Sequence, residues 1–180
     1  MVGNRLVKIG IAIDGVDGSG KSTIANAIHR QYGYPVLSVD IFRKSTYLPL
    51  AIRQWGDVPM VAVLEKIGFS GCVFDRSLIS VLAYNHDPFL PGNSIAIYDD
   101  LVGFLPWYQE KIFFVFSTYY DVDVVLSRKD ALSKNDLIRS NGSFRKVYDL
   151  ANINPCIVFA EDSIGKKVQL IMAQYLEYKK

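Results

Sequence analysis

Cysteine and histidine are scarce in this chain, which has two residues of each type in 180. Cys72 and Cys156 both fall within short apolar runs, so we interpret them as core residues in a reducing compartment. A disulfide framework and a Cys/His metal site are therefore not expected. Lys8 and Asp14 interrupt the first apolar run, which argues against a signal peptide and favours a cytoplasmic protein.

Long apolar runs and an excess of one charge are also missing. The chain has no stretch of about 18 apolar residues, so we expect no membrane-spanning helix. The formal net charge is only +2, which gives no general electrostatic signal for nucleic acid. A local basic groove that binds DNA stays open as a hypothesis.

The chain does have enough apolar material for one folded unit, with 50% hydrophobic and 21% charged residues. We expect a single domain over residues 1–180. Strand-like runs at 6–13, 35–39, 72–74, 112–116 and 156–160 alternate with helix-like patterns. This alternation predicts a three-layer α/β/α fold, with a five-stranded, mostly parallel sheet and helices on both faces. Such sheets bind ligands at the carboxyl ends of their strands.

The most specific motif follows the first of these runs. Residues 15–23 fit the phosphate-binding pattern G-x-x-x-x-G-K-[ST] without a mismatch, between a strand-like and a helix-like stretch. Its glycines let backbone N–H groups point at phosphate oxygens, and the helix adds partial positive charge. Lys21 is expected to bridge the β- and γ-phosphates of ATP, and the Ser22 hydroxyl to take a Mg²⁺ position. The predicted nucleotide-binding residues are Gly15, Gly18, Ser19, Gly20, Lys21, Ser22 and Thr23.

Two carboxylates are candidates for the acceptor side. Asp17 lies inside the loop, where it either holds a hydroxyl or amine of the acceptor or caps local N–H groups. Asp40 ends the second strand-like run, and it either accepts a proton from an attacking hydroxyl, steers Mg²⁺ through water, or caps a helix. Phe42 and Arg43 follow, and we expect both on the acceptor side. Arg43 would neutralise an acceptor phosphate or the transition-state charge.

Asp75 and Arg76 directly follow the third apolar run. At this strand end, we expect Asp75 to support Mg²⁺ and Arg76 to bridge the donor and acceptor phosphates. Ser80, Tyr84 and Asn85 come next on a helix-like stretch and are candidates for contacts with a base or sugar. Tyr84 is equally compatible with a core position.

A polar, partly basic segment at about 128–140 predicts a lid that closes over the triphosphate and excludes water. Arg128 is the candidate catalytic cation of this lid, and Lys129, Lys134 and Arg139 are further candidates for charge on the transferred phosphoryl group. Charged side chains in such a segment are equally typical of a solvated surface.

Together these residues resemble the thymidylate kinase and deoxynucleoside kinase branch of the phosphate-loop kinases, in family order from residue 6 to about residue 175. The run 15–23 looks like the thymidylate kinase loop, in which an Asp holds the sugar hydroxyl of the acceptor. This implies that role for Asp17. The series from Asp75 to Asn85 is similar to that family's Asp-Arg-aromatic, Ser, Ala-Tyr-Gln series, whereas Asp75-Arg76-Ser77 resembles the Glu-Arg-Ser motif of deoxynucleoside kinases. Segments 126–128 and 144–151 resemble the two borders of the lid.

The resemblance implies a phosphate-loop kinase fold and a kinase that uses ATP and Mg²⁺ on a nucleoside-type acceptor. A deoxynucleoside monophosphate such as dTMP is the leading acceptor. The alternative is a hydroxyl acceptor: a deoxynucleoside, a polynucleotide 5′-hydroxyl, or a modified base such as hydroxymethyluracil in DNA. This alternative arises because the run from Asp40 to Arg43 looks like the Asp-x-x-Arg of polynucleotide 5′-kinases. Asp40 would then be the general base.

Two wider questions stay open at this stage. A homodimer is compatible with the sequence, which gives no direct signal for association. A GTP-dependent switch would need an Asn-Lys-x-Asp motif, which the run from Lys134 to Asp136 matches only superficially. The kinase is therefore the favoured hypothesis.

Overall fold

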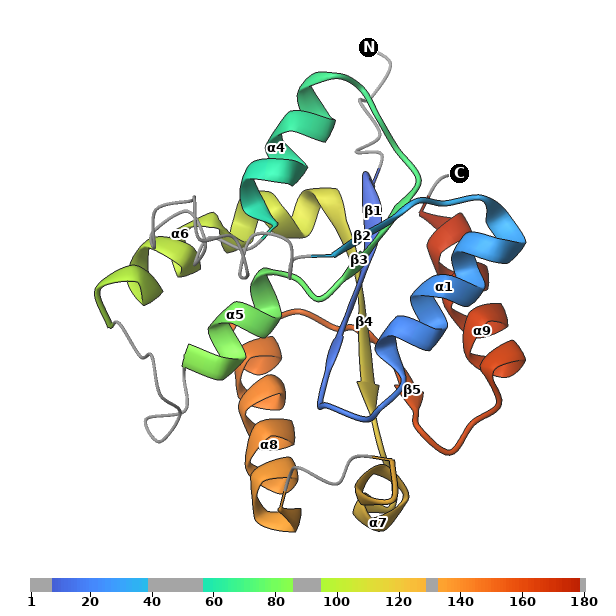
Figure 1. Ribbon diagram of the computed structural model, residues 1–180. Coiled ribbons are helices and arrows are strands. Elements are labelled where there is room, and N and C mark those ends of the chain that lie inside the picture. The colour runs from blue at the N-terminus through green and yellow to red at the C-terminus, as the bar shows by residue number, and fades with distance from the viewer. Residues whose placement is uncertain (1–7, 39–56, 86–94, 129–132, 179–180) are drawn as a thin grey trace.

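The computed structural model describes residues 8–38, 57–85, 95–128 and 133–178, and its centre is one parallel sheet (Figure 1). The strands are β1 (Gly10–Gly15), β2 (Val36–Ser38), β3 (Cys72–Asp75), β4 (Ile112–Thr118) and β5 (Cys156–Phe159). They are ordered β2-β3-β1-β4-β5, and each described pairing is parallel. The predicted five-stranded sheet is confirmed, although β1 begins later than expected and runs into the glycine-rich loop.

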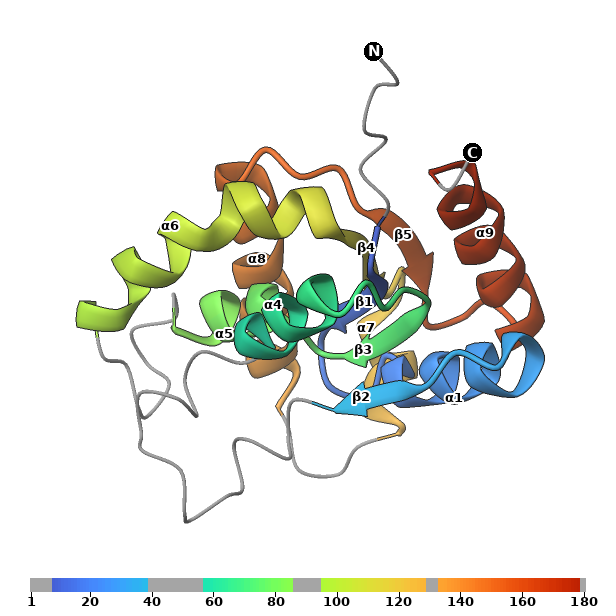
Figure 2. The same cartoon turned by 90° about the horizontal axis from the view of Figure 1, so that it is seen from above.

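Helices cover both faces of this sheet (Figure 2). Helices α1 (Lys21–Tyr32) and α9 (Ile164–Glu177) lie on one face. The other face carries α4 (Val58–Lys66), α5 (Leu78–Asn85), α6 (Ile95–Lys111) and α8 (Lys134–Leu150). A short helix, α7 (Val122–Leu126), follows β4. This arrangement confirms the expected three-layer α/β/α fold.

The two layers of helices enclose two separate hydrophobic clusters because side chains alternate along each strand. On β1, Ile11 and Ile13 pack toward α1 and α9, whereas Ala12 packs toward α5 and α6. Cys72 and Cys156 are buried, one in each cluster, as expected for core residues. Burial on both faces explains why the strands appear in the sequence as nearly continuous apolar runs.

The parallel register brings three strand ends to one edge of the sheet. Ile13 of β1 is paired with Asp75 of β3, and Gly15 is paired with Ser117 of β4. The loop that follows β1 and the turn that follows β3 therefore lie next to each other, although about 60 residues separate them in the sequence. Within the described part of the chain, no helix is long and apolar enough to cross a membrane.

Candidate active site

The loop between β1 and α1 depends on a close approach that only glycine permits. Gly15 has a φ of 137°, and a Cβ at this position would lie 1.9 Å from the carbonyl oxygen of Ser117. The Ser19 hydroxyl donates to the carbonyl of Val16 at 2.8 Å, and Gly20, in a left-handed conformation, directly precedes α1. The predicted residues 15–23 therefore form the tight strand–loop–helix turn that the motif requires.

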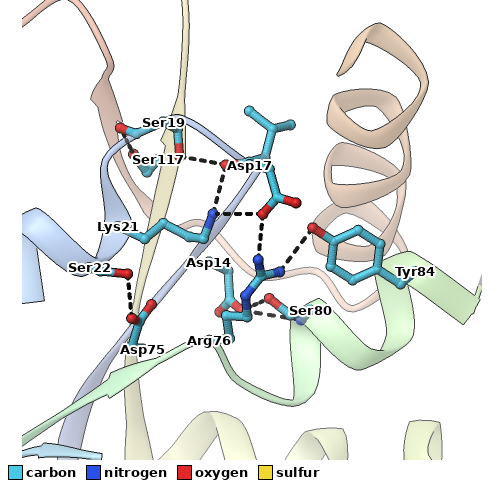
Figure 3. A network of polar contacts seen from close by, with 11 residues as sticks. Asp14, Asp17, Ser19, Lys21, Ser22, Asp75, Arg76, Ser80, Tyr84 and Ser117 are labelled. Atoms are coloured by element: carbon cyan, nitrogen blue, oxygen red, sulfur yellow. Dashed lines mark hydrogen bonds and ion pairs between the residues drawn. The ribbon is translucent and has the colours of Figure 1, made fainter. Parts of the chain in front are cut away.

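Lys21 lies in the first turn of α1 with its ammonium group folded back over the loop (Figure 3). Its side chain is only 6% exposed, and Nζ donates to the carbonyl of Val16 at 2.7 Å. Asp17 Oδ1 lies 3.9 Å from the same nitrogen. Burial, and then the positive charge of Arg76, lower the pKa of Lys21 to about 8. An anion in the loop would relieve both effects, which favours phosphate binding here.

Ser22 and Asp75 form a second contact at the same edge of the sheet. The Ser22 hydroxyl donates to Asp75 Oδ2 at 2.6 Å, which joins the start of α1 to the end of β3. Hydroxyl and carboxylate oxygens are the hard ligands that Mg²⁺ takes in phosphate-binding sites, with phosphate and water completing its shell. These two residues therefore fit the metal position predicted for them.

Arg76 connects the phosphate loop to helix α5. Its guanidinium forms an ion pair with Asp17 and donates from Nη1 to the Tyr84 hydroxyl at 2.9 Å (Figure 3). The Tyr84 ring in turn packs edge-on against Phe144, with ring centroids 5.6 Å apart. Arg76 also has a φ of 77°, which is rare for a residue with a side chain. Such a backbone is maintained only where the surroundings enforce it, and it is typical of functional sites.

Sequence reasoning missed the carboxylate beneath this network. Asp14 is fully buried at the end of β1, and the hydroxyls of Ser77 and Ser80 each donate to it at 2.5 Å. Burial raises the pKa of Asp14, against the effect of these hydrogen bonds. The available signal was a carboxylate at the end of an apolar strand, directly before the loop. Ser80 is itself buried against Asp14, and its proposed contact with a base or sugar stays a prediction.

A cavity of about 730 Å³ opens over these groups. One wall is formed by the loop from Asp17 to Thr23, together with Asp75 and Arg76. Arg128 and Lys167 also line this cavity: Arg128 Nη2 donates to the carbonyl of Ala160 at 3.3 Å, and Lys167 Nζ donates to the same oxygen at 3.1 Å. Arg128 was a predicted site residue, whereas Lys167 was not.

Lys167 was hard to predict because its helical position looks like an ordinary surface position of α9. The structure instead places it at only 2% exposure, and burial lowers the pKa of its ammonium group. The lining of the cavity therefore includes two cations, Arg128 and Lys167, in addition to Lys21 and Arg76.

Two other predicted cations, Lys134 and Arg139, are not among the described residues that line this cavity. Lys134 forms an exposed ion pair with Asp123 at 2.9 Å, and Arg139 pairs with Asp136 at 3.0 Å. Residues 134–140 of the predicted lid form the first turns of α8. Several predicted residues lie outside the described part of the chain: Asp40, Phe42, Arg43 and Lys129, together with the side chain of Asn85.

Comparisons in sequence find no matching family model and no matching curated protein. Solved structures do match. A deoxyadenosine kinase from M. mycoides with bound dATP is 16% identical, with a TM-score of 0.63 over 92% of this chain and 98% of that chain. The same kinase with dCMP and dCDP is 17% identical, with a TM-score of 0.60 over 93% and 99%. The YorR protein of Bacillus subtilis, in complex with phosphorylated GDP, is 18% identical, with a TM-score of 0.61 over 95% and 98%. These likenesses confirm the expected fold.

Proposed function

We propose that this chain is a kinase that transfers the γ-phosphate of ATP, with Mg²⁺, to a nucleoside-type acceptor. The observation that carries this proposal is the convergence of Lys21, the Ser22–Asp75 pair and Arg76 on one cavity. Phosphoryl transfer needs little covalent help from the protein, so a cavity that positions phosphates among fixed charges is sufficient machinery. The shared fold with deoxyadenosine kinase supports the same reading.

Each of these groups has a role in the proposed reaction. The loop N–H groups and Lys21 bind the triphosphate, while Ser22 and Asp75 would hold Mg²⁺. The metal ion supplies positive charge that offsets the negative charge developing on the transferred group. Arg76 lies between the loop and α5, where it can bridge donor and acceptor. Arg128 adds a further cation to the lining of the cavity.

The leading acceptor is a deoxynucleoside monophosphate such as dTMP, because Asp17 and the series from Asp75 to Asn85 resemble thymidylate kinases. An attacking phosphate oxygen is already ionised, so this reaction needs no general base. A specific observation favours a second candidate, a deoxynucleoside: two of the matching solved structures are of a deoxyadenosine kinase. Asp40 would then accept the proton of the attacking hydroxyl.

The test is an acceptor screen with purified protein, Mg²⁺ and γ-labelled ATP. The panel contains the four deoxynucleoside monophosphates, the four deoxynucleosides, a 5′-hydroxyl oligonucleotide and DNA with hydroxymethyluracil. Label on dTMP would support the leading acceptor, and label on a nucleoside or DNA hydroxyl would replace it. No transfer to any acceptor would overturn the kinase proposal.

Asp40→Asn separates the two classes of acceptor by their chemistry. The variant should lose about a hundredfold or more in kcat if a hydroxyl attacks, and much less if a phosphate attacks.

A cytoplasmic location, a homodimer and contact with DNA stay predictions, which fractionation, sedimentation and a binding assay would test.

A further inference from the structure

Helix α5 starts two residues after Arg76, and the N–H groups at this start are held by Asp14 of β1 and by Ser77, which directly precedes the helix. The N–H groups of Ser77 and Ser80 donate to Asp14 Oδ1 at 2.9 and 3.2 Å. The N–H of Ile79 donates to the Ser77 hydroxyl oxygen at 3.1 Å. Helix starts normally leave such groups to solvent or to a local cap, whereas α5 has the local cap of Ser77 and is also fixed by Asp14 of strand β1.

A second buried carboxyl lies beside the same helix start. Asp57 directly precedes α4 and is only 1% exposed, yet its side chain makes no cap to its own helix. It instead accepts a hydrogen bond from the Tyr108 hydroxyl, which comes from α6 and is fully buried. An Asp at the start of a helix usually caps that helix, so this inward orientation indicates another role.

Asp57 lies next to α5, because its neighbour Val58, its partner Tyr108 and Leu78 of α5 all belong to one buried cluster. Burial raises its pKa to about 7, the Tyr108 hydroxyl opposes this, and nearby Asp14 adds to it. The backbone N–H of Leu78, the first residue of α5, also faces the carboxyl and lowers that pKa. Its Oδ1 atom has no hydrogen-bond partner among the described residues, so the second oxygen is not tied to α4 or to α6.

We propose that Asp57 and Tyr108 are positioning residues that, together with Asp14, hold the start of α5 and thereby fix Asp75 and Arg76 for phosphoryl transfer. We call Asp14, Asp57 and Tyr108 the α5 clamp. The proposal rests on the proposed kinase function, because only then do Asp75 and Arg76 need exact placement. The unusual φ of Arg76, 77°, lies one residue before the clamped turn, where a loose helix start would let it relax.

The test compares Asp57→Ala, Asp57→Asn and Tyr108→Phe with the wild-type protein. Amide hydrogen exchange over residues 75–80 reports the clamp directly, and Mg²⁺–ATP binding reports the phosphate loop. Label transfer to dTMP or deoxyadenosine, whichever the wild type phosphorylates, gives kcat and KM. Asp121→Ala is the matched control, because it removes an exposed Asp that caps helix α7 and has no described contact with α5.

We expect Asp57→Ala to raise exchange over residues 75–80 by about tenfold and to lower kcat by about tenfold or more. The dissociation constant for ATP should stay within about twofold, because the phosphate loop is intact. Asp57→Asn should recover most of kcat, since its amide oxygen still accepts from Tyr108. Tyr108→Phe should move both readouts in the same direction by a smaller amount.

Two results would overturn the proposal. One is that Asp57→Ala and Tyr108→Phe both fold and have the same amide exchange over residues 75–80 and the same kcat as the wild type. The other is that the Asp121→Ala control loses as much kcat as Asp57→Ala, because the loss would then reflect lower stability of the whole protein. If Asp57→Ala does not fold, Tyr108→Phe decides alone, because it removes a single hydroxyl. If the wild type transfers label to no acceptor, the kinase proposal fails, whereas the exchange data still decide whether the clamp exists.

Discussion

Helices α1 and α5 both begin at the same edge of the sheet, but their first turns are built in opposite ways. Helix α1 follows Gly20, with no acidic residue in its first turn and no side-chain cap from the described residues. Helix α5 starts against the carboxylate of Asp14 and beside that of Asp57. A helix start attracts negative charge, and the N–H groups at the start of α5 receive it from Asp14, whereas no side chain caps the start of α1. From this comparison we expect α1 to face a bound phosphate and α5 to support the site.

We expect the largest effect from removing Lys21, the cation at the start of α1. Lys21→Ala takes away the ammonium group that lies buried over the loop. We expect kcat/KM to fall by about a thousandfold, whichever acceptor is used. Arg30→Ala is the matched control, because it removes a cation from the last turn of the same helix. Activity near the wild-type level in Lys21→Ala would refute the assignment of α1 to phosphate.

Removing Asp14, the carboxylate at the start of α5, should lower the stability of the fold more than it weakens nucleotide binding. Asp14→Ala leaves two buried serine hydroxyls and two backbone N–H groups without their acceptor. We expect a loss of about 3 kcal/mol in the free energy of unfolding, measured by denaturant titration. Asp14→Asn should cost less, because its amide oxygen still accepts. A loss in Asp14→Ala no larger than in Asp121→Ala would show that α5 does not depend on Asp14.

A carboxylate can also be added at Gly20, directly before α1. Gly20 has a φ of 92° and no atom within 4 Å of an added Cβ, so Asn and Asp both fit there with similar backbone strain. The two variants differ in one charge. Gly20→Asp should therefore bind ATP about tenfold more weakly than Gly20→Asn, measured by titration calorimetry. Equal affinities would mean that the start of α1 does not face the phosphates.

The contrast between the two helices also separates what the sequence could predict from what it could not. Residues 15–23 are contiguous, and their spacing alone predicts the tight turn between β1 and α1. Asp75 and Arg76 could be placed because parallel strands end at a shared edge. The Asp14–Ser80 and Asp57–Tyr108 contacts join residues 66 and 51 positions apart, so no local pattern encodes them. Helical spacing separated Ser80 from the apolar positions, but it does not tell which neighbour Ser80 faces.

The smallest predicted effect follows from the titration of Lys21. Burial lowers its pKa to about 8, so the ammonium form is present below that pH and is lost as the pH rises through it. Bound ATP would raise this pKa again by adding negative charge, so binding above that pH must take up a proton. ATP affinity should therefore fall by about threefold from roughly pH 7.5 to roughly pH 8.5.

Lys21→Arg provides the control for that titration, because a guanidinium keeps its charge throughout this range. The Arg variant should bind ATP with an affinity that stays flat over the same interval, even if its absolute affinity is lower. Its calorimetric titrations in two buffers of different ionisation enthalpy should show no proton uptake, whereas the wild type should show uptake. A wild-type affinity as flat as that of Lys21→Arg would mean that Lys21 is fully charged before ATP binds. Burial would then not lower the pKa of Lys21 at the start of α1. The difference from the buried carboxylates at the start of α5 would lie only in the positions of the charged groups.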